Sequence, residues 1–152
     1  MAKLTLTIND DGSQDEVGDA VVLTNTTDVF GGSSVSNEAD YVGFRIVNVT
    51  VPQAATIRHA AIKVNLASVK TSATTYNLKG ENVDNSAEFT TAVDNISGRA
   101  LTTALIDETT HPIHDLPNGY RVWDVTAIVQ EIVNRAGWVS GNAMAFIFNT
   151  AT

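Results

Sequence analysis

Apolar and polar side chains alternate along much of the chain, a pattern that predicts β-strands. Leu4, Leu6 and Ile8 alternate with threonines, which predicts an N-terminal strand with one buried face. Residues 9–13 combine Asn, Asp, Gly and Ser, which favour a turn. The apolar run at residues 20–23 is then typical of a short buried strand.

A second group of strands is expected in the middle of the chain. Residues 42–51 alternate, but their apolar phase shifts from even to odd positions, which indicates a bulge or a passage between two layers. Pro52 ends this run and begins a turn, because proline cannot donate a hydrogen bond to a strand ladder. A long strand is expected next at residues 57–69, and a shorter one at residues 74–80.

The C-terminal third predicts three strands and one helix. The strands are expected at residues 100–106, 120–125 and 143–149. Near residues 125–136 the apolar period changes to that of an amphipathic helix, with a stripe formed by Val125, Ile128, Val129, Ile132 and Val133. Asp124 or Thr126 is expected to cap its first amides, and Gly137 to end it in the left-handed conformation.

Composition supports an all-β fold. The 152 residues include 19 Thr, 18 Val and 10 Ile, whose branched side chains pack well on a pleated sheet. The sequence therefore predicts a two-layer antiparallel β-sandwich with one short helix near residues 125–136. A chain of this length buries enough surface for one core, so we expect a single domain, with residues 1–18 as an N-terminal strand or arm and residues 19–152 as its body.

Net charge and cysteine content exclude several classes of function. The formal net charge is −8, whereas proteins that bind nucleic acid gain affinity from lysine and arginine, so no nucleic-acid partner is expected. Without cysteine there is no thiolate nucleophile or cysteine-ligated metal. No apolar run could span a bilayer and the first residues lack the apolar core of a signal peptide, so we expect a soluble product with no membrane partner.

The histidines give little support for an enzyme. His59 is expected in a strand, where a role at the surface or the edge of the core outweighs catalysis. His111, His114 and Asp115 lie near Pro112 and could offer two imidazoles and a carboxylate to a metal ion or a hydrolase, but a solvated loop is the preferred interpretation. We therefore expect a non-catalytic protein without catalytic, cofactor-binding or metal-binding residues.

Three further features are weighed and set aside. Residues 9–16 collect acidic and amide oxygens around a glycine, as calcium requires, but their spacing does not match an EF-hand, so a solvated turn is preferred. Asp84-Asn85 and Asp94-Asn95 are interpreted as turn formers. Ser140 lies one position late for a nucleophile elbow and follows a helix instead of a strand.

Sugar binding would require exposed aromatic rings. Trp123 is expected in the core, and Trp138 is expected to cover the end of the helix. Tyr41, Tyr76 and Tyr120 are the better candidates for a wet surface, although they form no continuous stripe.

Three blocks of sequence carry a resemblance to a known module. They are residues 44–57, residues 84–89 with 95–99, and residues 123–143, which end in the string QEIVNRAGWVSGNA. Together they resemble a jelly-roll-like β-sandwich module found in bacterial extracellular proteins and in phage proteins. The resemblance covers about residues 19–149 of this sequence. It implies a jelly-roll-like sandwich and a non-catalytic role in an assembly or at a surface, and it transfers no catalytic residues.

The resemblance and the missing signal peptide together lead to a hypothesis about function. We expect a phage capsid decoration, or cement, protein made in the host cytoplasm and carried on the virion surface. Its expected partners are the major capsid protein and further copies of itself, in a symmetric oligomer such as a trimer, with the N-terminal segment as the main contact. The alternative is a carbohydrate-binding or adhesion module of a phage tail or surface assembly.

Overall fold

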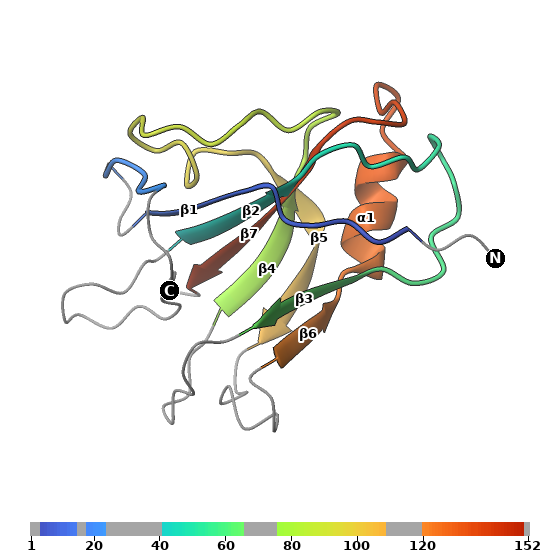
Figure 1. Ribbon diagram of the computed structural model, residues 1–152, viewed down its shortest axis with the longest axis horizontal. Coiled ribbons are helices and arrows are strands. Elements are labelled where there is room, and N and C mark those ends of the chain that lie inside the picture. Colours follow the sequence, from blue (N-terminus) through green and yellow to red (C-terminus); the bar gives the residue numbers. More distant parts are fainter. Residues whose placement is uncertain (1–3, 15–17, 24–40, 66–75, 109–119, 151–152) are drawn as a thin grey trace.

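The computed structural model describes residues 4–14, 18–23, 41–65, 76–108 and 120–150 (Figure 1). Within these ranges the chain forms seven strands and one helix. They are β1 (Asp10–Gln14), β2 (Tyr41–Ile46), β3 (Ala61–Asn65), β4 (Tyr76–Glu81), β5 (Leu101–Glu108), β6 (Tyr120–Asp124), α1 (Thr126–Val133) and β7 (Met144–Thr150). In the described part of the chain, no helix is long and apolar enough to cross a membrane.

The strands form two antiparallel sheets. The larger sheet has five strands in the order β1-β2-β7-β4-β5, and β3 pairs with β6 in the smaller one. Every pairing is antiparallel. The expected all-β class with a single short helix is therefore confirmed at this level, for the described residues.

One face of the five-stranded sheet packs against α1 and the β3–β6 sheet. Strands β2, β4 and β7 direct alternate apolar side chains to this face, as their period-2 pattern requires. Trp123 of β6 packs edge-on against Phe148 of β7, with ring centroids 4.9 Å apart, and donates its indole N–H to the Tyr76 hydroxyl at 3.0 Å. This aromatic contact joins the two sheets.

The opposite face of the five-stranded sheet carries a second, smaller core. Phe89, Ile96 and Val21 come from segments outside the strands and cover Ala145 and Ile147 of β7. Gly43 of β2 makes room for the Phe89 ring, because a Cβ atom there would lie 2.5 Å from it. The sheet is thus covered on both faces, but the second cover consists of loops.

A bulge in β5 connects the helix to the sheet. The pairing of β4 with β5 shifts register between Lys79 and Glu81, and the Gly80 N–H donates to the Thr102 hydroxyl at 3.0 Å instead of to a backbone oxygen. The N–H groups of Thr103 and Ala104 both donate to the Glu131 carboxylate of α1, at 2.8 Å each. The side chain of Glu131 therefore satisfies the backbone of the bulge.

The later strands were predicted well. The expected strands at residues 74–80, 100–106, 120–125 and 143–149 correspond to β4, β5, β6 and β7. The long strand expected at residues 57–69 is shorter where it is described: it begins at Ala61, and residues 66–69 lie outside the described part of the chain.

The N-terminal predictions were wrong. Residues 4–8 form no strand, and the first strand lies at residues 10–14, where a turn was expected. Long-range pairing with β2 overrides the turn preference of these Asp and Gly residues. Residues 20–23 form only two isolated bridges, Ser13 with Val22 and Ala20 with Val93.

The strand predicted to continue through residues 47–51 was also wrong. Strand β2 ends at Ile46, and Asn48 adopts a positive φ of 56°, which breaks the extended backbone. Val49 is nevertheless buried in the main core, and its N–H donates to Asn142. The apolar residues at odd positions between 47 and 51 therefore correctly indicated burial, but they do not form a strand.

Helix α1 confirms the predicted apolar stripe. Ile128, Val129, Ile132 and Val133 are buried, and the helix occupies the central part of the expected segment. At its start, the Thr126 N–H donates to Asp124 Oδ1 at 2.9 Å. Gly137 is not left-handed as expected; it is needed because a Cβ atom would collide with the Asp84 carboxylate.

Candidate interaction surfaces

The N-terminal segment, residues 4–9, is the first candidate surface, because it combines exposed apolar side chains with backbone groups that are not hydrogen-bonded within the described residues. Leu4 and Leu6 are 46% and 36% exposed, while Ile8 packs against the main core. Asn9 fixes the end of the segment: its N–H donates to the Arg45 carbonyl at 2.9 Å, and its side-chain oxygen accepts from the Val47 N–H. Within the described residues, the backbone of residues 4–8 makes no hydrogen bond.

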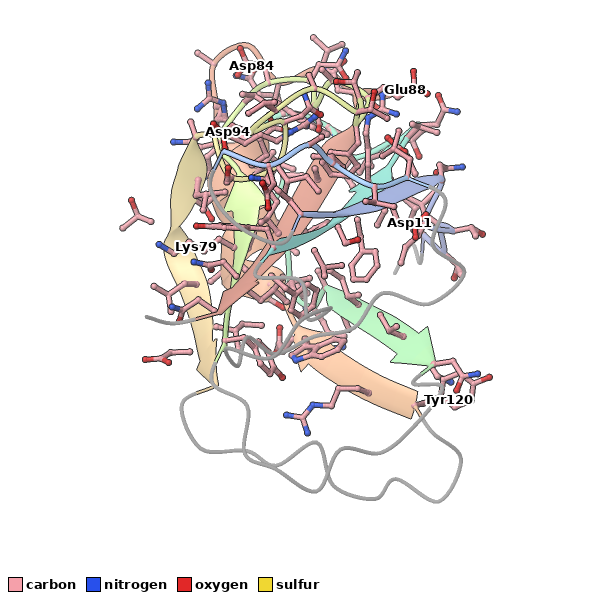
Figure 2. The ribbon with its side chains drawn as sticks, turned by 90° about the vertical axis from the view of Figure 1, so that its left-hand side faces the viewer. Asp11, Lys79, Asp84, Glu88, Asp94 and Tyr120 are labelled. Carbon is pink, nitrogen blue, oxygen red and sulfur yellow. The ribbon has the colours of Figure 1, made fainter. Side chains whose placement is uncertain are left out.

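The outer face of the β3–β6 sheet is a second surface. It consists of alternate residues of both strands: Ala61, Lys63, Asn65, Tyr120, Val122 and Asp124. Tyr120 and Val122 are 40% and 52% exposed. Lys63 Nζ lies 4.1 Å from the centroid of the Tyr120 ring, within the range of a cation–π contact. Figure 2 shows Tyr120 at the end of β6, away from the five-stranded sheet.

Asp124 links this outer face to the start of α1. Hydrogen bonds from the Thr126 side chain and backbone lower the pKa of the Asp124 carboxyl, and His59 contributes more weakly. The His59 Nδ1 atom lies 3.9 Å from Asp124 Oδ2, and both side chains are about two-thirds exposed. His59 is thus a surface residue, as predicted, in a long and solvent-exposed contact with the Asp124 carboxyl.

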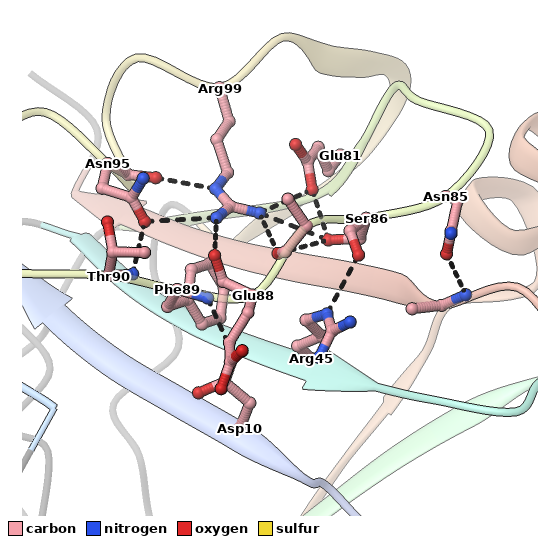
Figure 3. A network of polar contacts seen from close by, with 12 residues as sticks. Asp10, Arg45, Glu81, Asn85, Ser86, Glu88, Phe89, Thr90, Asn95 and Arg99 are labelled. Atoms are coloured by element: carbon pink, nitrogen blue, oxygen red, sulfur yellow. Dashed lines mark hydrogen bonds and ion pairs between the residues drawn. The ribbon is translucent and has the colours of Figure 1, made fainter. Parts of the chain in front are cut away.

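The loop cover on the far face of the five-stranded sheet is held by Arg99. Its guanidinium forms an ion pair with Glu81 at 2.8 Å, and both side chains are less than a tenth exposed. It also donates to the carbonyls of Ala87, Glu88 and Asn95 and lies over the Phe89 ring (Figure 3). Arg99 therefore fixes residues 86–95 to the end of β4.

A second polar cluster joins this cover to β1. The Asp94 carboxylate accepts hydrogen bonds from the Gly18 N–H, the Ser97 hydroxyl and the Gln14 side chain. The Gln14 side-chain oxygen in turn accepts from the Ile96 and Ser97 N–H groups. The expected role of Asp94 and Asn95 as turn formers is confirmed, and the turn is bonded to the sheet edge.

The hydrogen bonds of Asp94 predict that the stability of the protein falls at low pH. Donation by the Gly18 N–H, followed by that of Ser97 and Gln14, lowers the pKa of Asp94 below its ordinary value of 3.8. Because the pKa is depressed in the folded state, the contribution to stability is present above pH 3.8 and is lost as the pH falls through the folded-state pKa. We expect the Asp94→Asn variant to melt at a lower temperature than the wild type at pH 7, and the difference to narrow below pH 3.8.

Thermal melting followed by circular dichroism between pH 7 and pH 2 measures this difference. The Asp107→Asn variant, at an exposed position of β5, is the control and should melt close to the wild type at pH 7. A difference between Asp94→Asn and the wild type that stays constant across the range would contradict the assigned role of the Asp94 carboxylate.

Most of the other candidate residues lie outside the described part of the chain. His111, His114 and Asp115 lie outside the described residues, as do Asp15 and Glu16 of the weighed calcium motif. Its remaining part forms β1, where Asp10 accepts from the Phe89 N–H. Within the described ranges, no three histidine, aspartate or glutamate side chains form a group that could hold a metal ion.

The tryptophans lie as predicted, but two of the three tyrosines do not, and one of these, Tyr41, is only partly exposed and packs against the second core. Trp123 and Trp138 are buried, and Trp138 donates its indole N–H to the Val51 carbonyl. Tyr120 is exposed as expected, whereas Tyr76 was wrongly proposed for a wet surface and is only 2% exposed. Tyr76 lies two positions before Leu78 and therefore on the same face of the strand, and this spacing already favoured burial.

Comparisons with known proteins give no relative. No family model matches the chain, and no curated protein or solved structure matches it either. The function is therefore argued from the two surfaces described above.

Proposed function

We propose that this protein is a non-catalytic structural component of a phage virion, a decoration protein that stabilises the capsid shell. Its partner on the shell is the major capsid protein, and it acts as a symmetric oligomer such as a trimer. The finer fold assignment, a jelly-roll-like β-sandwich, belongs to the same proposal. It is supported by the packing of the β3–β6 sheet and α1 on one face of the five-stranded sheet.

The observation that carries the proposal is that exposed apolar side chains lie on a fold whose loops are fixed by hydrogen bonds and a buried ion pair. Leu4 and Leu6 project from an extended segment, and Val122 projects from the outer face of a sheet. Threonines alternate with Leu4 and Leu6, and fixing such short side chains in an interface costs little rotamer entropy. Many small contacts of this kind, repeated over a symmetric shell, add up to strong attachment.

Co-sedimentation with empty, expanded phage shells tests the proposal. We expect the purified protein to pellet with shells at a fixed ratio per capsomer and to raise the temperature at which the shells fall apart. The Val122→Asp variant should bind about tenfold more weakly or worse, because it places a carboxylate in the apolar contact. Lys79→Asp, on the other sheet, is the control. Failure of the wild type to pellet with any shell of its host's phages would overturn the proposal.

A second candidate is a carbohydrate-binding or adhesion module. Tyr120 favours it, because an exposed ring next to Lys63 and Asn65 offers both a stacking surface and hydrogen-bond donors for a sugar. A glycan array read with and without calcium tests this function. Binding that is lost in Tyr120→Ala would support it, and an array without signal would count against it.

A further inference from the structure

The N-terminal segment has the sequence pattern of a strand but forms none in the described part of the chain. Its apolar and polar residues alternate as in a strand with one buried face, yet the backbone of residues 4–8 pairs with nothing in the described part of the chain. The segment is anchored at Ile8 and Asn9, on the main core and on β2. A strand-forming sequence that is fixed at one end and unpaired along its length is suited to pair with an edge elsewhere.

The β3–β6 sheet has only two strands, so a further strand can pair with one of its edges. Two-stranded sheets are marginal, and a third strand adds both hydrogen bonds and a wider face. Among the described strands, β3 and β6 pair only with each other. In both views β6 lies farther from β1 and β2 than β3 does (Figures 1 and 2), and no described strand pairs with the outer edge of β6.

The two edge strands of the five-stranded sheet, β1 and β5, are less able than β6 to pair with an added strand. On β1, Ser13 exchanges two backbone hydrogen bonds with Val22, of 2.8 and 3.0 Å. On β5, the bulge interrupts the ladder, and Glu131 already accepts from two of its N–H groups. Within the described residues, β6 is therefore the edge best able to receive a strand.

The charge of residues 4–9 and of β6 is compatible with a second copy of this chain as the partner. Each copy carries a net charge of −8, so two copies repel one another except where the contacting surfaces are uncharged or balanced. Residues 4–9 hold no charged side chain, and β6 holds one arginine and one aspartate. The five residues 4–8 also match the five residues of β6 in length.

We propose that residues 4–8 of one copy add as an outer strand to β6 of a second copy. This inference rests on the self-association in the proposed function and names the contact that produces it. Alternation then places Leu4 and Leu6 on one side of the extended sheet and Thr5 and Thr7 on the other. The addition uses only the edge of β6, so the outer face with Tyr120 and Val122 remains free for a further partner.

Proline substitution tests the contact without disturbing the fold. Thr5→Pro/Thr7→Pro removes two backbone N–H donors from a segment whose backbone bonds nothing else in the described residues. We expect self-association, measured by light scattering across a concentration series, to weaken about tenfold or more, with an unchanged circular dichroism spectrum. Thr5→Ala/Thr7→Ala keeps both donors and should associate like the wild type. Equal association of the proline and alanine variants would overturn the proposal, as would a wild type that stays monomeric.

Disulfide trapping identifies the partner strand. The chain holds no cysteine, so an introduced pair forms the only disulfide available. We expect Thr5→Cys/Val122→Cys or Thr7→Cys/Val122→Cys, which cover two neighbouring registers, to form covalent dimers or larger chains on oxidation. Thr5→Cys/Val139→Cys, with its second cysteine at an exposed position outside the sheets, should not. A disulfide within single chains, or equal dimer yield in the control, would overturn the β6 assignment.

These experiments use no phage shells, so their outcome does not depend on shell binding. Shell binding by an intact protein that fails both tests would leave the decoration role standing and remove only the strand addition. Strand addition without shell binding would leave a self-assembling protein with a different role.

Discussion

Replacement of Trp123 by alanine is expected to lower the free energy of unfolding by about 3–5 kcal/mol, the range for deleting a buried large aromatic side chain. The indole is 3% exposed, packs against Phe148 and donates its N–H to the Tyr76 hydroxyl. It is also the main aromatic link between β6 and the five-stranded sheet, so the smaller sheet should lose its attachment. Urea denaturation followed by circular dichroism and by fluorescence of the remaining Trp138 measures the change.

Two variants on the same strand separate packing from hydrogen bonding. Val122→Ala faces outward and should change stability by no more than about 0.5 kcal/mol. Trp123→Phe keeps most of the ring contact with Phe148 but removes the hydrogen bond from the indole N–H to the Tyr76 hydroxyl, so the loss of stability should be intermediate. If Trp123→Ala were as stable as Val122→Ala, the packing of the two sheets described here would be wrong.

Replacement of Arg99 by alanine is expected to cost about 3–5 kcal/mol, because it leaves a buried carboxylate without its partner. Glu81 would retain the Ser86 hydroxyl but lose the guanidinium, and the carbonyls of Ala87 and Glu88 would lose their donors. The residues around Phe89 should then detach before the rest of the protein unfolds. Chemical denaturation, together with hydrogen exchange of residues 86–99, measures both effects.

The matched control is a second ion pair, between Arg135 and Asp84. Arg135 bonds Asp84 at 2.7 Å, but the two side chains are 32% and 42% exposed, so Arg135→Ala should cost only about 1 kcal/mol. The double variant Arg99→Met/Glu81→Met removes both charges and should be more stable than Arg99→Ala alone. If Arg99→Ala lost no more stability than Arg135→Ala, the Arg99–Glu81 pair would not be what holds the loop cover.

The sequence predicted the C-terminal half of the fold closely. Strands β4 to β7 and helix α1 have clear periods of 2 and 3.6, and each buries the side chains that its period selects. Local pattern and tertiary packing agree there, so short-range reasoning succeeds. At residues 4–14 they disagree: the alternating leucines stay outside the sheet, and the turn-forming Asp and Gly residues pair with β2.

The candidate surfaces were predicted in part. The N-terminal segment and Tyr120 were both named from the sequence, and both are exposed where they are described. The central role of Arg99 was missed, because its partners lie between 4 and 18 positions away in a stretch with no regular period. An arginine beside a glycine in a polar loop gives no sign that its charge will be buried.

The sequence by itself determined an all-β chain with one helix, most strand positions and the faces that they bury, since these follow from local side-chain periodicity. Only the tertiary structure decided which strands pair, since register depends on contacts between distant residues such as Asp10 with Arg45. It also decided that β3 and β6 form a separate sheet and that, within the described residues, the backbone of residues 4–8 is left unpaired. A strand's pattern specifies a face to bury, whereas its partner is chosen by the competition among all edges of the folded chain.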